Sequence, residues 1–99
     1  CLIVPKKHAQ SLIEMDDEDL SSLIKASKKV ARAMSLGFGN GSFNILMNNG
    51  KDAGQVVNHA HLHIIPRFQK DRLRLKWSHL KYDDNEIKEY ADKIKKFID

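Results

Sequence analysis

Three histidines at alternate positions are the residues of this chain whose spacing is best suited to chemistry. They are His59, His61 and His63. If the segment is a β-strand, successive side chains point to opposite faces and the three imidazoles share one face. The other face then carries Ala60, Leu62 and Ile64, which are of the kind that packs beneath a helix. Each imidazole has two ring nitrogens that burial must satisfy, so three in register favour a functional site over packing alone.

Two kinds of chemistry are compatible with this histidine face. Catalytic zinc often takes three protein ligands and a water molecule. Alternate residues of a straight strand lie about 6.5–7 Å apart, so bringing all three imidazoles to one ion would need a sharp bend. The linear spacing is better suited to nucleophilic catalysis, in which the outer two histidines orient the middle one. We therefore expect His61 to be the nucleophile, with three-histidine zinc catalysis as the alternative.

Apolar spacing predicts two helices. Acidic residues at 16–19 precede apolar residues at helical intervals up to Met34, which predicts a long helix that stops at Gly37. Residues 83–86 are typical of a helix start. The apolar positions of this second helix are Ile87, Tyr90, Ala91, Ile94, Phe97 and Ile98. The single tryptophan, Trp77, is expected to be a packing anchor.

Two further strands are expected beside the histidine segment. Residues 2–4 predict a buried strand that ends at Pro5, which cannot donate to a ladder. Alternation over residues 42–48 predicts another strand, and the Asn-Gly pair and spaced glycines of 49–54 predict a loop. The basic residues 6–8 then form either a solvated turn or a rim that attracts phosphate.

Composition indicates one small globular domain covering residues 1–99. The 99 residues are 41% hydrophobic and 30% charged, with a net charge of +4 and one cysteine. No stretch approaches the ~20 apolar residues that a membrane span requires. The single cysteine fits a reducing compartment. The positive charge favours anionic ligands, but the basic residues are dispersed among acids, which argues against a nucleic-acid-binding stripe.

The residues around the histidines resemble a known family. Residues 54–65 read Gly-Gln-Val-Val-Asn-His-Ala-His-Leu-His-Ile-Ile, which is similar to the signature of the histidine triad (HIT) family of nucleotide hydrolases and transferases. Residues 2–8 and the Asn-Asn-Gly of 48–50 also match, in the family's order. The longer C-terminal half is closer to the bacterial HIT-like branch. The resemblance implies an α+β fold, with an antiparallel β-sheet, a long helix packed on one face and a C-terminal helix.

The resemblance also implies roles for individual residues. The His61 Nδ1 should donate to a backbone carbonyl, which leaves Nε2 free to attack an α-phosphorus and form a nucleotidyl-imidazole. His59 would hold the local network and His63 would bind phosphate oxygens. Substrate-binding groups are placed at Asn48, Gln55, Val56 and Val57. The last two belong to a cradle of backbone N–H groups running from Gly54 to Val57.

The expected activity is hydrolysis of the α-phosphate bond of nucleoside 5′-phosphoanhydrides or phosphoramidates, with a purine nucleotide as substrate. The alternative is a non-catalytic nucleotide-binding or scaffold protein of the same family. A relative that removes adenylate from DNA ends is disfavoured by the dispersed charge. No cofactor is required for the expected reaction. The resemblance further implies a cytoplasmic homodimer that lacks its N-terminal segment here. It assigns no metal to these residues but leaves structural zinc open in the intact protein, where His59 could be a ligand.

One position departs from the family's pattern. Many members carry Ser or Thr directly after the Gly-Gln pair, where a hydroxyl can relay a proton to the leaving group, whereas this chain has Val56. An amine cannot leave unprotonated, but a nucleoside di- or triphosphate is already a stable anion. The sequence therefore predicts weaker cleavage of phosphoramidates relative to dinucleoside polyphosphates than in a serine-bearing relative.

Overall fold

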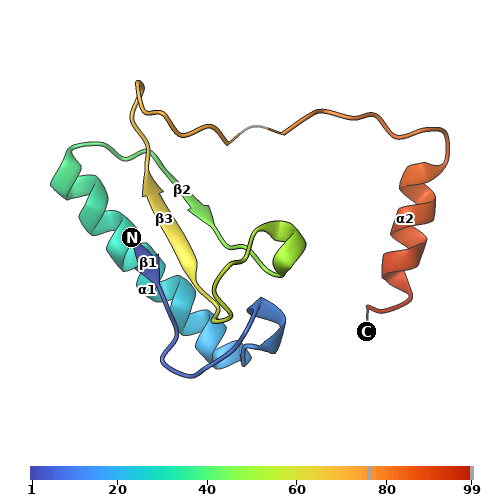
Figure 1. The fold of residues 1–99 in the computed structure, drawn as a ribbon, viewed down its shortest axis with the longest axis horizontal. Helices are drawn as coiled ribbons and strands as arrows, with labels where there is room; N and C mark the ends of the chain where they lie inside the picture. Colours follow the sequence, from blue (N-terminus) through green and yellow to red (C-terminus); the bar gives the residue numbers. More distant parts are fainter. Residues whose placement is uncertain (76, 99) are drawn as a thin grey trace.

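The computed structural model describes residues 1–75 and 77–98, which form a three-stranded sheet, a long helix and a separate second helix (Figure 1). The strands are β1 (Leu2–Ile3), β2 (Phe43–Leu46) and β3 (Leu62–Pro66). The helices are α1 (Asp17–Phe38) and α2 (Glu86–Lys95), with short 3-10 turns η1 (Leu12–Glu14) and η2 (Lys51–Ala53). Neither α-helix of the described residues is long and apolar enough to span a lipid bilayer.

The sheet is antiparallel, in the order β1-β3-β2, so the strand that follows the first two histidines is central. On one side Leu2 lies opposite His63, and on the other Leu46 lies opposite the same histidine. The regular ladder of β3 begins only at Leu62, so His61 lies just before it. The ladder cannot extend further along β1, because the neighbouring chain reaches Pro5, which has no N–H to donate.

The core lies between α1 and one face of the central strand. Ala60, Leu62 and Ile64 are at most 2% exposed, and α1 contacts both β3 and β1. From α1, the buried residues Leu23, Ser27 and Ala31 occupy helical positions four apart. The Ser27 hydroxyl donates to the Leu23 carbonyl at 2.7 Å, so this buried polar group is satisfied. The predicted α+β fold and the predicted core face of the histidine segment are confirmed.

Both ends of α1 follow ordinary helix chemistry, although the C-terminal end differs from the prediction. Three acids occupy the first turn, where they complement the helix dipole. The helix passes through Gly37 and ends at Gly39, which has the left-handed φ of 67°. The N–H groups of Gly39 and Asn40 both bond the Ser35 carbonyl. The end is at Gly39 because this glycine, not Gly37, adopts the left-handed conformation that closes the last turn.

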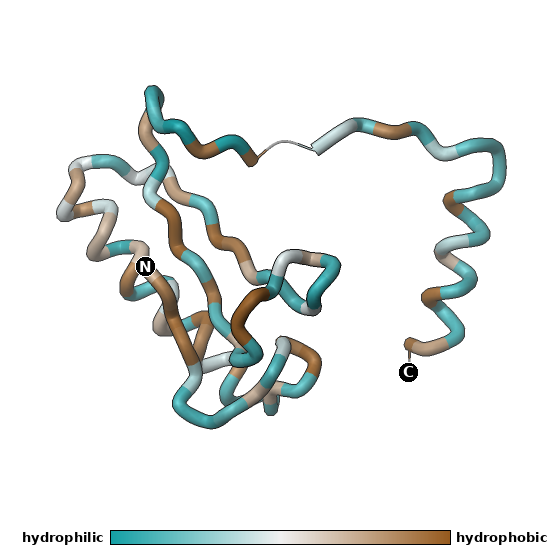
Figure 2. Tube along the Cα trace, viewed as in Figure 1, coloured by the Kyte–Doolittle hydropathy of each residue, from teal (hydrophilic) through white to brown (hydrophobic). Residues whose placement is uncertain are grey.

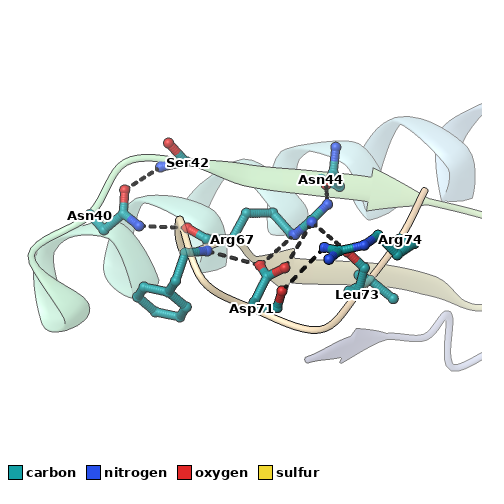
Figure 3. A network of polar contacts seen from close by, with 8 residues as sticks. Asn40, Ser42, Asn44, Arg67, Asp71, Leu73 and Arg74 are labelled. Atoms are coloured by element: carbon teal, nitrogen blue, oxygen red, sulfur yellow. Dashed lines mark hydrogen bonds and ion pairs between the residues drawn. The ribbon is translucent and has the colours of Figure 1, made fainter. Parts of the chain in front are cut away.

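A network around Arg67 fastens the chain that leaves β3 (Figure 3). The guanidinium makes two bonds to the carboxylate of Asp71, at 2.8 and 3.0 Å. It also donates to Asn44 Oδ1 on β2, at 2.6 Å, and to the carbonyl of Leu73, at 3.0 Å. The side-chain amide of Asn40, just beyond α1, donates to the Arg67 carbonyl at 2.5 Å. Arg67 thereby fixes the direction in which the chain leaves the sheet.

Beyond this network, residues 72–75 and 77–98 form an arm that carries α2 away from the sheet and from α1 (Figure 1). Apolar and polar residues alternate along α2 (Figure 2), and Ile87 and Ile94 are 64% and 61% exposed. Trp77 is 75% exposed, so the prediction that it anchors packing within this chain is wrong. We name this segment the C-terminal arm.

The first strand is less buried than predicted. Ile3 packs against the core, whereas Leu2 and Val4 are 58% and 54% exposed. The reason is the position of β1 at the edge of the sheet, with α1 covering only one face. The two exposed side chains lie on the same face as the histidines, where they line a cavity described below.

Candidate active site

The imidazole of His61 is held by a main-chain carbonyl. Its Nδ1 lies 2.7 Å from the carbonyl oxygen of His59. A carbonyl oxygen can only accept a hydrogen bond, so Nδ1 must carry the proton. In the neutral ring the lone pair then resides on Nε2, the nitrogen needed for attack on an electrophile.

His59 is held from both sides. Its Nε2 lies 3.0 Å from the carbonyl oxygen of Pro5, so Nε2 carries the proton. Its Nδ1 lies 3.1 Å from Nδ1 of His8. A neutral His59 therefore accepts at Nδ1 and His8 donates, which assigns a tautomer to each ring. The contact with His8 was not predicted from the sequence, because the two residues are 51 positions apart.

The three histidines lie on the face of the sheet opposite α1. All three are half-buried, in alternation with the fully buried residues of the core face. The rings of His61 and His63 meet edge to face, with centroids 5.1 Å apart. His59 and His61 line one cavity together. The structure thus brings the three imidazoles together as the alternation predicted.

An apolar cavity of about 370 Å³ lies against the histidines. It is lined by Leu2, Val4, Val57, His59 and His61. Its mixture of aliphatic walls and imidazole edges suits a flat ligand that also carries a polar group. The place of Leu2, on β1, and of Val4, just after β1, in this cavity wall was not predicted from the sequence. The signal that could have found them is the alternation in residues 2–4, which places Leu2 and Val4 on one face.

The predicted substrate-binding residues lie around the loop that precedes the histidines. Asn48 is half-buried, and its side-chain amide lies beside Gly54. If Gly54 carried a Cβ, that atom would be 4.0 Å from Asn48 Nδ2. The side chain of Gln55 bonds three main-chain groups of the protein. Val56 is 90% exposed and Val57 is 61% exposed. Among the described residues, the N–H groups of these two valines have no hydrogen-bond acceptor.

The basic residues near the start of the chain are partly committed elsewhere. The ammonium group of Lys7 lies 2.6 Å from a carboxylate oxygen of Asp16. This pair is exposed, and the hydrogen bond and charge of Asp16 raise the pKa of Lys7. The positive charge of Lys7 is therefore directed at a neighbouring acid and not at the histidine face.

The side chains of the described residues do not suffice for a zinc site. Zinc in proteins takes three or four protein ligands, and residues 1–75 and 77–98 contain no group of three or more His, Cys, Asp or Glu that could hold a metal. His59 and His8 would supply two imidazoles. For zinc to bind at His59, which the resemblance left open for the intact protein, the remaining ligands would have to come from outside these residues.

The fold and the site define a class: an α+β domain in which a row of imidazoles faces a ligand cavity beside a glycine-containing loop. The family model of the HIT domain matches residues 1–70. The chain therefore belongs to the HIT family.

Individual relatives support this assignment. The HIT-like protein MJ0866 of Methanocaldococcus jannaschii is 45% identical over 84 residues, which are 84% of this chain and 64% of that protein. The adenosine 5′-monophosphoramidase hnt1 of Schizosaccharomyces pombe is 35% identical over 94% of this chain and 68% of its own length. A crystal structure of a HIT family member from Bacillus subtilis has a TM-score of 0.88 and 35% identity, over 99% of this chain and 72% of that one.

The chain spans about two thirds of the length of these relatives. The match to the Bacillus subtilis structure covers 99% of this chain and therefore includes the C-terminal arm.

Proposed function

We propose that this chain is part of a nucleotide hydrolase that cleaves the α-phosphate bond of nucleoside 5′-phosphoanhydrides or phosphoramidates through a covalent nucleotidyl–His61 intermediate. The observation that carries the proposal is the 2.7 Å contact between His61 Nδ1 and the His59 carbonyl oxygen. It assigns the lone pair to Nε2, the atom that must attack phosphorus. The name of the Schizosaccharomyces pombe relative, an adenosine 5′-monophosphoramidase, supports the substrate class.

In the first step, Nε2 of His61 forms a bond to the α-phosphorus. The bond from phosphorus to the leaving group breaks, and its electron pair departs with that group. In the second step a water oxygen attacks the same phosphorus, the P–N bond breaks, and its electron pair returns to Nε2. The attacking water releases one proton to solvent and an amine leaving group takes one up, so the products are the leaving group, a nucleoside monophosphate and free imidazole. No cofactor takes part in either step.

Charge that develops on the phosphoryl oxygens needs hydrogen-bond donors. The N–H groups of Val56 and Val57, which have no acceptor in residues 1–75 and 77–98, are suited to this role. His63 beside His61 can supply another donor. In comparable sites each oriented donor contributes about 3 kcal/mol in the transition state. Asn48 is proposed to contact the phosphates from the other side of the loop.

The apolar cavity supports binding of a nucleoside. Leu2, Val4 and Val57 give it aliphatic walls, and its volume of about 370 Å³ suits part of a nucleotide next to the histidines. We assign a purine nucleotide on the resemblance and on the adenosine substrate in the name of the relative. A cytoplasmic location belongs to the same proposal.

A non-catalytic nucleotide-binding or scaffold protein is the alternative. It would use the same cavity and the same loop, but His61 would form no bond to phosphorus. The two functions therefore differ in the covalent intermediate and not in binding.

The deciding experiment is to mix the chain with an adenosine phosphoramidate or a diadenosine polyphosphate, quench it, and measure the mass of the protein. We expect a nucleotidyl adduct on His61 that is lost in His61→Ala, with hydrolysis falling at least about 10⁴-fold, as when other catalytic nucleophiles are removed. His79→Ala, at an exposed histidine of the C-terminal arm, is the matched control. Nucleotide binding without an adduct would support the scaffold alternative.

The proposed partner is a second copy of the chain, and the C-terminal arm supports it. Trp77, Leu80 and Phe97 are at least 75% exposed, which leaves a series of large apolar side chains uncovered in a single copy. Such a series marks an interaction surface. Because the match to the Bacillus subtilis structure includes the arm, its extended placement is shared with that protein. We propose a homodimer in which each arm packs on the other copy, so that residues 1–99 act as one domain.

A further inference from the structure

The side-chain amide of Gln55 is bonded to the main chain at three points. Its Oε1 accepts from the N–H of Gly50 at 2.8 Å, and its Nε2 donates to the carbonyls of Gln10 at 2.6 Å and Val57 at 2.9 Å. A primary amide has only two N–H donors, so both are in use. Gln55 could donate to a phosphate oxygen only if it gave up one of these bonds.

The loop that Gln55 braces has a backbone shape that needs support. Gly50 has φ 90° and ψ 160°, and Gly54 has φ 90°, conformations that other residues rarely adopt. The main-chain N–H of Gln55 also donates to the Gly50 carbonyl at 3.1 Å. Gln55 therefore connects the beginning of the loop, at Gly50, with its end, at Val57.

A second amide strengthens the same connection. Oδ1 of Asn49 accepts from the N–H of Leu12 at 2.8 Å. Together with the bond from Gln55 to the Gln10 carbonyl, it ties the 49–57 loop to the segment around η1. These two contacts join residues 37 and 45 positions apart. The loop is thus fixed to the segment around η1 by two of its own side chains, in addition to its internal turns.

We propose that Gln55 is a positioning residue, which holds the 50–57 loop and the N–H groups of Val56 and Val57 in the arrangement that a nucleotide phosphate meets beside His61. The identity of this ligand rests on the proposed function. The role of Gln55 in bracing the loop does not rest on the proposed function, because its three hydrogen bonds are made without any ligand. The proposal replaces direct contact with substrate as the role of Gln55.

The first test is backbone hydrogen exchange in the nucleotide-free chain. Gln55→Met keeps the length of the side chain and removes the amide. We expect the hydrogen-bonded amides of the loop, which are those of Gly50, Ala53, Gly54 and Gln55, to exchange at least about tenfold faster, Gly50 above all, because several hydrogen bonds are lost together. Gln69→Met makes the same change at an exposed glutamine beyond β3 and should leave the loop unchanged. Unchanged loop exchange in Gln55→Met would overturn the proposal.

The second test uses Gln55→Glu, which covers the case in which the methionine variant fails to fold. A carboxylate can still accept from Gly50 but cannot donate to the two carbonyls, whereas the protonated acid regains one O–H donor. Loop protection relative to Gln69→Glu should therefore be low at neutral pH and recover as the pH falls below ~4.3, the ordinary pKa of a glutamic acid. Protection that stays low throughout would contradict the proposal.

Nucleotide binding gives a third readout. Adenosine monophosphate should slow loop exchange in Gln55→Met back towards the wild-type rate, since a bound phosphate would order the free N–H groups. If Gln55→Met bound adenosine monophosphate more weakly but showed unchanged loop exchange without nucleotide, Gln55 would instead be identified as a direct ligand of the nucleotide. If no chain hydrolyses any nucleotide, the proposed function fails, while the exchange measured without nucleotide still decides the role of Gln55.

Discussion

The imidazole of His61 is oriented by the carbonyl of His59, two residues earlier in the same segment, at 2.7 Å. The histidine repeat therefore positions its own central member, because one residue of the repeat supplies the carbonyl that fixes the tautomer of another. His59 in turn is held through Pro5 and His8. Within the part of the chain that the structure describes, the proposed nucleophile is oriented by a main-chain carbonyl and not by an acidic side chain.

The first prediction concerns Val56 and the protonation of the leaving group. Val56→Ser should raise turnover of an adenosine phosphoramidate relative to a diadenosine polyphosphate, because a hydroxyl at this position can pass a proton to a departing amine. The change is expected in the ratio of kcat/KM values for the two substrates. At 90% exposure the residue supports no packing, so folding should not change.

Val57→Ser is the control for this prediction. It introduces the same hydroxyl one position later, in the wall of the cavity, and should weaken binding of both substrates without favouring the phosphoramidate. A valine form that already prefers the phosphoramidate would show that no hydroxyl relay is needed.

The second prediction concerns Asp71 and how the free energy of unfolding depends on pH. The hydrogen bonds from Arg67, followed by the N–H of Phe68, hold the pKa of the Asp71 carboxyl well below its usual range. Because the folded pKa lies below the unfolded one, the contribution to stability is complete above the unfolded value. It is lost progressively as the pH falls below ~3.9, the ordinary aspartate value, towards the folded pKa.

The measurement is the free energy of unfolding of wild type and Asp71→Asn across pH. The variant should be less stable at neutral pH, and the difference should shrink as the solution is acidified below about pH 4. Asp52→Asn removes an exposed acid instead and should show no comparable difference. A difference between wild type and Asp71→Asn that is independent of pH would mean that the charge of Asp71 is not what stabilises the network.

The third prediction concerns the C-terminal arm and the proposed homodimer. Chains labelled with ¹⁵N and unlabelled chains are refolded together and treated with a lysine cross-linker. Cross-links between a lysine of the arm and a lysine of residues 1–71 should include mixed-isotope pairs if the arms are exchanged between copies. Cross-links that join only chains of the same isotope would mean that each arm packs on its own chain.

A substitution on α2 tests the same contact. Ile94→Glu should shift the chain towards a monomer in sedimentation equilibrium, because a charge on an apolar packing face is costly to bury. Lys95→Gln changes the net charge by the same amount at an exposed neighbour and should leave the mass unchanged. A monomeric wild-type chain would contradict the proposed homodimer directly.

The fourth prediction concerns backbone strain at Gly50. Gly50→Ala should lower the free energy of unfolding by about 1–3 kcal/mol, because alanine rarely adopts its conformation of φ 90° and ψ 160°. Gly41 has no such positive φ, and a Cβ there would meet no atom within 4 Å. Gly41→Ala should therefore be close to neutral. If both substitutions lowered the free energy of unfolding equally, the backbone strain at Gly50 would be small.

Local repetition in the sequence was enough to predict part of this protein. Alternation from His59 to Ile64 identified both the face of imidazoles and the core face, because the side-chain period of an extended chain is two. Apolar spacing identified both helices. In each case the information lies within a few residues, where backbone geometry alone decides which side chains share a face.

Only the tertiary structure decided which distant groups meet. The pairing of His8 with His59, the bonds of Gln55 to Gln10 and the placement of Arg67 between Asn44 and Asp71 join segments that no periodicity relates. The exposure of Trp77 likewise depends on where the chain turns after β3. Side-chain bonds to remote main-chain groups are specific to each fold, and hydrophobic patterning, which records only burial, does not encode them.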